Sequence, residues 1–141
     1  MISAKGKSAV NSADRTPART GRTVVRTAAQ PFQLYDLEGP LQPEMSWLPI
    51  SYDRRSGTGC YLMRMAPGAV TIPHDHPGME EFLMLEGELI DDDGAVFGPG
   101  DFVSYEAGTH HNSRTETGCL IAVFEWRRSV PAATGAPEGR D

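Results

Sequence analysis

The chain has 141 residues, of which 13 are Lys or Arg and 19 are Asp or Glu, so its formal net charge is -6 at pH 7. This length allows one domain with a substantial core and is too short for two. No apolar run approaches the roughly 18 residues of a membrane-spanning helix, and no apolar stretch typical of a secretory signal is present at the N-terminus. Cys60 and Cys119 lack CxxC spacing and are typical of reduced thiols, so we expect a cytoplasmic protein.

The charge is divided unevenly along the chain. Residues 1–30 hold six basic residues and one acid, with almost no large apolar side chains, whereas residues 31–141 hold seven basic and eighteen acidic residues. A segment so poor in apolar side chains cannot offset the entropy cost of ordering, so we expect residues 1–30 to form a disordered basic arm. Docking on an acidic partner and organellar targeting are the alternatives for this arm. The acidic remainder should bind no nucleic acid.

Short apolar segments alternate with turn signals from residue 31 to residue 128, and residues 129–141 have the composition of a flexible tail. The expected strands cover residues 32–35, 45–52, 60–65, 82–85, 89–90, 95–97, 102–105 and 120–126. Asp93-Gly94 is typical of a hairpin turn, and the GPGD run that starts at Gly98 indicates a second tight turn. No stretch has convincing helical periodicity. The pattern predicts an all-β domain, either a compact antiparallel barrel or a two-sheet sandwich.

The stretch PHDHPGMEEFLMLEGE contains two of the four histidines. His74 and His76 are separated by one residue, so on an extended strand both imidazoles point to the same face, which suits chelation of a metal ion. Glu80 reaches that face as well if the intervening residues keep the alternation. Another strand should supply a further ligand. Either His110 or His111 can do so, and only one of them can face inward because adjacent residues on a strand point in opposite directions.

The residues around these two histidines resemble the first motif of the cupin family. In that motif a Gly is followed after five residues by His-x-His, then by a Glu and, six residues later, by a second Gly. Every spacing is met by Gly68, His74, His76, Glu80 and Gly87.

The segment GPGDFVSYEAGTHHNS resembles the second cupin motif. Gly100, Gly108 and His111 occupy motif positions, and this match selects the second histidine of the adjacent pair as the ligand. Glu106 stands where the family has Pro, and Thr115 stands where it has Asn. These two positions shape a turn and its surroundings, so the departures remove no ligand.

The segments SWLPISYD, CYLMRMAPGA and GCLIAVFEW further resemble the cupin-like domain of ChrR-type zinc anti-sigma factors. The resemblance implies an antiparallel double-stranded β-helix, the jelly-roll barrel of cupins, over residues 31–128. Because no Cys/His zinc module precedes this domain, we expect no anti-sigma role. The resemblance also implies one divalent transition metal, Fe, Mn, Ni, Cu or Zn, held by His74, His76, Glu80 and His111.

Stand-alone cupins of this kind include dioxygenases that cleave β-diketones or hydroxyketones, together with isomerases, decarboxylases and pure binders. We therefore expect a metal-dependent dioxygenase or related oxidoreductase acting on a small ketone, enol or aromatic acid. Glu80 would then be a ligand that detaches and serves as a catalytic base. The alternatives are a ChrR-like sensor cupin that binds metal or metabolite without catalysis, and a cupin whose metal only stabilises the barrel. Since cupins often pair, we expect a homodimer.

The substrate pocket of such a protein should be mostly apolar. Phe82 and Met84 share strand parity with Glu80, and Tyr61 and Met63 lie on the apolar face of an earlier strand. These four side chains are therefore the expected pocket lining, although plain core residues alternate in the same way.

Overall fold

The computed structural model describes residues 19–128. The chain divides into two units, residues 1–31 and residues 32–141. The described part of the first unit contains one short 3-10 helix, η2 (Thr27–Ala29). The predictions made for residues 1–18 and for the tail after residue 128 lie outside the described residues. In the described part of the chain, no helix is long and apolar enough to cross a membrane.

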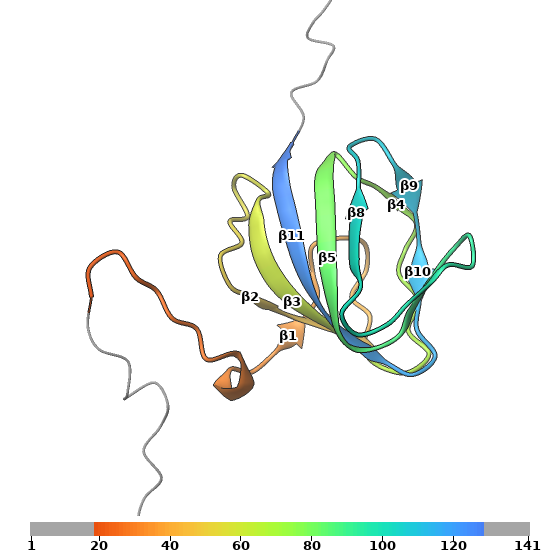
Figure 1. Ribbon diagram of the computed structural model, residues 1–141, viewed down its shortest axis with the longest axis horizontal. Coiled ribbons are helices and arrows are strands. Elements are labelled where there is room, and N and C mark those ends of the chain that lie inside the picture. Colours follow the sequence, from red (N-terminus) through yellow and green to blue (C-terminus); the bar gives the residue numbers. More distant parts are fainter. Residues whose placement is uncertain (1–18, 129–141) are drawn as a thin grey trace, which may run out of the picture. The chain divides into compact units, whose positions relative to one another are not determined.

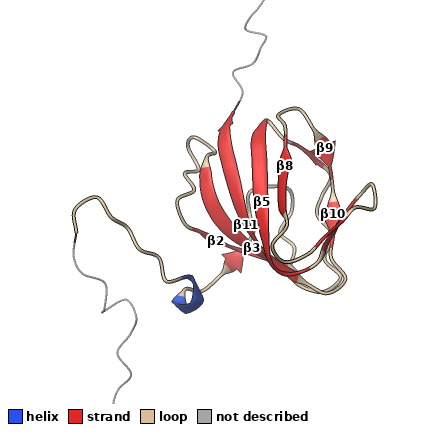
Figure 2. Ribbon diagram, viewed as in Figure 1, coloured by secondary structure: helices blue, strands red, loops and turns tan. Residues whose placement is uncertain are grey.

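The second unit is built from β-strands joined by turns (Figures 1 and 2). The strands are β1 (Gln33–Leu34), β2 (Met45–Pro49), β3 (Gly59–Met65), β4 (His74–Asp75), β5 (Gly78–Gly87), β6 (Leu89–Asp91), β7 (Val96–Phe97), β8 (Phe102–Tyr105), β9 (His110–His111), β10 (Ser113–Arg114) and β11 (Cys119–Arg128). Each of the eight apolar segments predicted from the sequence overlaps one strand. The other three strands, β4, β9 and β10, consist of polar residues only, so apolar alternation does not reveal them.

All strand pairs are antiparallel, and they form three sheets. The large sheet has the order β1-β2-β3-β11-β5-β8, the second has the order β10-β6-β7, and the third pairs β4 with β9. Figure 1 shows β9 and β10 on the side of β8 away from β2 and β3. The ring of Phe82 on β5 contacts the ring of Phe97 on β7 with centroids 5.9 Å apart, so the second sheet packs over the large one. This is the antiparallel double-stranded β-helix predicted from the sequence.

Both predicted turns are present. The amide of Gly94 donates to the carbonyl of Asp91 at 2.9 Å, and this turn joins β6 to β7. The amide of Asp101 donates to the carbonyl of Gly98 at 3.0 Å in the turn that precedes β8. The first turn thus pairs β6 with β7 in the second sheet, and the second turn leads the chain into β8, an edge strand of the large sheet.

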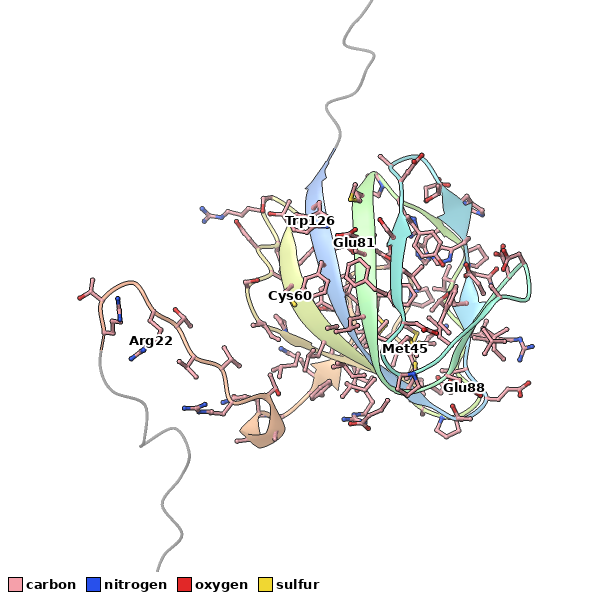
Figure 3. All side chains as sticks on the ribbon, viewed as in Figure 1. Arg22, Met45, Cys60, Glu81, Glu88 and Trp126 are labelled. Carbon is pink, nitrogen blue, oxygen red and sulfur yellow. The ribbon has the colours of Figure 1, made fainter. Side chains whose placement is uncertain are left out.

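Alternate residues of the long strands enter two apolar clusters on opposite faces of the large sheet. The inner cluster fills the barrel and includes Tyr35, Met45, Trp47, Tyr61, Met63, Met65, Phe82, Met84, Leu89, Cys119, Ile121 and Val123. The outer cluster contains Leu48, Leu62, Leu120 and Ala122. Figure 3 shows side chains filling the space between the large sheet and the strands opposite it. Both cysteines are free thiols, as the sequence predicts.

Gly87 ends β5 in a conformation that requires glycine. Its φ is +73°, in the left-handed region, and a Cβ at this position would collide with the carbonyl oxygen of Gly118. Any side chain here would force β5 away from β11, because the two backbones pair at Gly87 and Cys119. The last glycine of the first motif is therefore needed for the approach of these two strands.

Candidate metal centre

The short ladder between β4 and β9 brings the two histidine motifs together. His74 lies directly opposite His111, and Asp75 lies directly opposite His110. Adjacent residues of a strand point to opposite faces, so one pair faces the barrel and the other faces solvent. The outward pair joins the exposed side chains of His110 and Asp75, with Nδ1 and Oδ1 2.7 Å apart. His111 is buried at the inner face.

The inward side chains of both motifs converge on one point. One potential ligand atom from each of His74, His76, Glu80 and His111 lies within 4.8 Å of the corresponding atoms of the other three. The three imidazole centroids are 4.6 to 5.0 Å apart, and Nε2 of His76 is 3.4 Å from Oε1 of Glu80. Glu80 comes from β5 of the large sheet, across the barrel from the β4–β9 ladder.

Hydrogen bonds fix the tautomer of each imidazole. Nδ1 of His74 donates to the carbonyl of Ile72 at 2.7 Å, because a carbonyl oxygen can only accept. Nδ1 of His76 lies 2.8 Å from Oγ1 of Thr109, whose own hydroxyl donates to the carbonyl of Glu106. The hydroxyl oxygen of Thr109 must therefore accept a hydrogen bond from Nδ1 of His76.

His111 is fixed in the same way by a carboxylate. Its Nδ1 donates to Oδ1 of Asp91 at 2.7 Å. In its neutral form each of the three imidazoles consequently carries its proton on Nδ1 and presents the lone pair of Nε2. The Nε2 atoms of His76 and His111 are buried without a hydrogen-bond partner in the described structure.

This donor set fits a divalent transition metal. A buried lone pair without a partner is costly, and a metal ion at the point of convergence would satisfy it. Three neutral imidazoles and one carboxylate suit Fe, Mn, Ni, Cu or Zn, whereas Ca²⁺ prefers an all-oxygen site. The cluster can thus hold a metal ion, and its chemistry does not select one metal of that group.

Asp91 forms a hydrogen bond with His111 on the side of the imidazole away from the cluster. The sequence analysis did not identify this residue. Its carboxylate is buried and accepts three hydrogen bonds, from His111 at 2.7 Å, from Tyr105 at 2.5 Å and from Ser113 at 3.0 Å. Burial alone would raise the pKa of Asp91, but these hydrogen bonds outweigh it and lower the pKa. Asp91 stands at the start of the run DDDG, where its neighbours are exposed turn residues, so nothing in the sequence distinguishes it.

Glu125 is the second residue that sequence reasoning missed. It lies opposite Glu80 where β11 pairs with β5, and it accepts a hydrogen bond from the hydroxyl of Tyr61 at 3.2 Å. Burial, and next the neighbouring Glu80, raise the pKa of Glu125 to about 9. Glu125 therefore stays protonated at neutral pH, and its carboxyl group donates a hydrogen bond to the carboxylate of Glu80.

Glu80 itself is ionised. Burial by itself would raise the pKa of Glu80, but its close contacts with His76 and with the carboxyl group of Glu125 outweigh that effect and lower the pKa. The pair thus consists of one carboxylic acid and one carboxylate. Glu125 orients the carboxylate of Glu80 toward the imidazoles.

A chamber of about 60 Å³ opens beside the cluster. Besides His74, Glu80 and His111, its lining consists of Tyr35, Glu38, Pro40, Gln42, Met45, Tyr61, Met63, Met65, Thr71, Ile72, Phe82, Leu89, Ser113, Ile121 and Val123. Three of the four predicted pocket residues, Tyr61, Met63 and Phe82, lie in this lining. The fourth, Met84, is buried in the inner core and is not among the lining residues.

A second, more polar cavity of about 110 Å³ lies on the other side of Glu80. Its lining includes His76, Glu125 and Trp126, and it shares Tyr35, Glu38 and Glu80 with the apolar chamber. The candidate metal centre therefore lies between an apolar and a polar space.

The two departures from the second motif leave the site intact. Thr115 is buried, and its hydroxyl donates to the carbonyl of Glu88 at 2.6 Å. Its backbone also bonds to Gly68 and Ala69, which tie it to the first motif. The carbonyl of Glu106 accepts hydrogen bonds from the amide and the hydroxyl of Thr109. Glu106 thus supports the turn before the histidines through its backbone carbonyl, and Thr115 ties the segment after them to the first motif.

Comparison with known protein families decides the identity of this arrangement. Residues 20–129 match the family described as the ChrR cupin-like domain. The chain belongs to this family. No curated protein matches the sequence of this cupin-like domain.

Solved structures share the fold of the cupin-like domain at low sequence identity. An acetylacetone dioxygenase from Acinetobacter johnsonii matches with a TM-score of 0.62 and 12% identity over 78% of each chain. KdgF from Halomonas sp. matches with a TM-score of 0.56 and 18% identity over 74% of this chain and 94% of that one. These likenesses show the fold alone.

A further match is a chain from the complex of Rhodobacter sphaeroides SigE with the anti-sigma ChrR. It has a TM-score of 0.53 and 20% identity over 70% of this chain. The cupin-like domain covers 51% of that chain, so it corresponds to about half of its length.

We expect the substitution Asp91→Asn to weaken binding of Zn²⁺ by about tenfold or more, because outer hydrogen-bond partners of metal-binding histidines typically contribute that much. The amide oxygen of asparagine can still accept the hydrogen bond from Nδ1 of His111. The substitution nevertheless removes the negative charge of the carboxylate. Competition with a chromophoric chelator measures the change. Asp93→Asn is the matched control, since Asp93 is exposed in the same turn and its contact with the amide of Ala95 survives the change. Equal affinities for the two variants would contradict the role of Asp91.

Proposed function

We propose that this protein is a metal-dependent dioxygenase or related oxidoreductase that acts on a small ketone, enol or aromatic acid. The observation that carries the proposal is the convergence of three imidazoles and one carboxylate beside an apolar chamber, with the Nε2 atoms of His76 and His111 buried and without a hydrogen-bond partner in the described structure. The proposed metal ligands are His74, His76, Glu80 and His111. A divalent metal held by these residues would supply Lewis-acid chemistry to substrate oxygens.

The residues of the chain prepare this chemistry. His74, His76 and His111 would bind a divalent ion as neutral donors, so three neutral ligands and one carboxylate would leave the site with a net positive charge, which would favour an enolate. Apolar side chains such as Met63, Phe82 and Ile121 exclude water from the chamber.

Glu80 is the proposed catalytic base. Its carboxylate is ionised and lies between the chamber and the polar cavity, so it can accept a proton from a substrate carbon next to a carbonyl. Glu125 and Tyr61 form a hydrogen-bonded chain behind it, which would stabilise the carboxylate of Glu80.

We expect protein purified without added metal or chelator to contain Fe, Mn, Ni or Cu at about one ion per chain, since the four donors form one site. The substitution His111→Ala should abolish this content, because it removes one of three imidazole donors and leaves Asp91 without its main partner. Elemental analysis measures the result. His110→Ala is the matched control, because this neighbour points to solvent and should keep the metal.

Oxygen consumption with small ketones, followed with an oxygen electrode, should then be present in the wild type and in His110→Ala and absent in His111→Ala. Zinc alone, or no metal at all, would count against an oxygenase. Such a result would favour the second candidate function.

The second candidate is a sensor that binds a metal or metabolite without catalysis. The family match and the likeness to the SigE–ChrR complex favour it, because a ChrR cupin-like domain is part of a regulatory protein there. In this version the basic N-terminal arm would dock on an acidic partner.

Removal of residues 1–30 should separate the two functions. For an enzyme we expect unchanged metal content and turnover in the shortened protein, because every proposed ligand lies in the second unit. A sensor that signals through its arm should instead lose its partner in a pull-down assay with the full-length protein as reference. Signalling by the shortened protein would refute the arm-dependent sensor.

We further propose a cytoplasmic homodimer. Two free thiols are consistent with a reducing compartment. Exposed Phe102 and Trp126 on the outer face of the large sheet support pairing, because such a face is usually polar when it contacts water. Light scattering should give twice the mass of the chain, and a monomeric mass would reject the dimer.

A further inference from the structure

We infer that the chamber accepts ligands with one ionised or enolisable end, seated against the His/Glu cluster, and an uncharged remainder, and that it rejects ligands with a second ionised group. This inference rests on the proposed function and narrows its substrate class. It is carried by the chemistry of the chamber wall.

The wall offers no cation to a second anionic group. Among its lining residues there is no lysine or arginine, and the wall away from the cluster is formed mainly by side chains such as Met45, Met65, Leu89 and Val123. Transfer of an ionised carboxylate into such surroundings is costly unless a charged partner receives it. A ligand can therefore place one negative group at the metal but has no partner for another.

Three arginines of the β-strand unit hold their guanidinium groups outside the chamber. Arg54 pairs with Asp36 at 2.8 Å, and Arg114 pairs with Glu116 at 2.8 Å. Arg64 is exposed on the outer face of the large sheet, opposite the barrel interior. None of these three guanidinium groups lines the chamber.

The polar part of the wall adds acids and neutral groups. Glu38 borders both the chamber and the polar cavity, and its Oε2 is 3.9 Å from Nδ1 of His74. The remaining polar groups, which include Gln42, Thr71 and Ser113, can donate or accept hydrogen bonds but cannot neutralise a charge. A second carboxylate on the ligand would thus meet a carboxyl group or an apolar side chain.

The volume of the chamber also limits the size of the ligand and favours small ligands. A cavity of about 60 Å³ holds roughly five water-sized volumes of about 10–15 Å³ each. A short aliphatic chain beyond the metal-binding oxygens fits this space. Small β-dicarbonyl compounds and short 2-oxo monoacids therefore belong to the accepted class, whereas 2-oxo diacids belong to the rejected class.

The test compares two acids of equal chain length on protein loaded with Zn²⁺. 2-Oxopentanoate and 2-oxoglutarate share the metal-binding end and differ in a terminal methyl against a terminal carboxylate. Isothermal titration calorimetry should show binding of 2-oxopentanoate and at least about 30-fold weaker binding of 2-oxoglutarate, because the second charge stays unpaired. The 5-methyl ester of 2-oxoglutarate is larger but lacks that charge, so it should bind more tightly than the diacid.

A cation placed in the wall should weaken the preference for the monoacid. Gln42 is a half-buried lining residue, so Gln42→Arg should narrow the difference between the two acids by at least about tenfold. Gln33→Arg is the matched control, because Gln33 is exposed on β1 and does not line the chamber. It should leave the difference unchanged.

Three results would overturn the inference: equal or tighter binding of 2-oxoglutarate, no binding of either monoanionic ligand, or a difference that Gln42→Arg does not change. Zinc is not redox active, so these outcomes do not depend on oxygen chemistry. A protein that binds 2-oxopentanoate but consumes no oxygen with its native metal would refute the dioxygenase and leave the inference standing. A protein that takes up neither Zn²⁺ nor any other divalent transition metal would refute both, and its metal content identifies that case.

Discussion

The site depends on the register of two very short strands. β4 and β9 contain two residues each, and their pairing places His74 opposite His111. A shift of one residue would turn the imidazoles outward and bring Asp75 and His110 into the barrel. Neighbouring hydrogen bonds prevent this shift. The amide of His76 donates to the carbonyl of Thr109 at 2.9 Å, and the amide of Gly108 donates to the carbonyl of His76 at 2.7 Å.

The sequence predicts the inward ligands because they obey strand alternation or belong to a spaced motif. His74 and His76 share a face at a separation of two, and the apolar strands around them alternate in the usual way. Residues 74–75, 110–111 and 113–114 form strands that no apolar pattern indicates, since their side chains are polar and tertiary contacts alone make them extended. Glu125 could have been found, because it continues the inward series of Ile121 and Val123 along β11.

Asp91 is different, because its role arises only when the barrel closes. Its hydrogen-bond partners His111, Ser113 and Tyr105 are 14 to 22 residues away in the sequence. No local rule connects a carboxylate at the end of β6 with an imidazole on β9. Asp91 is thus held firmly by its neighbours in space, although no sequence pattern marks it. Hydrogen bonds, and not arginine or lysine side chains, offset the cost of burying its carboxylate.

The substitution of Thr for Asn in the second motif has a consequence for how related chains are recognised. Thr115 reaches the carbonyl of Glu88 and links the two motif segments through its backbone, so the neighbouring strand pair keeps its place without the usual amide side chain. Evolution can therefore exchange the residues that brace this turn while leaving the donor atoms where they are. Searches that demand the proline and the asparagine would discard such chains. A criterion based on which ring nitrogen of each histidine faces the cluster would retain them. It would rank distant relatives by the chemistry of the site instead of by motif letters.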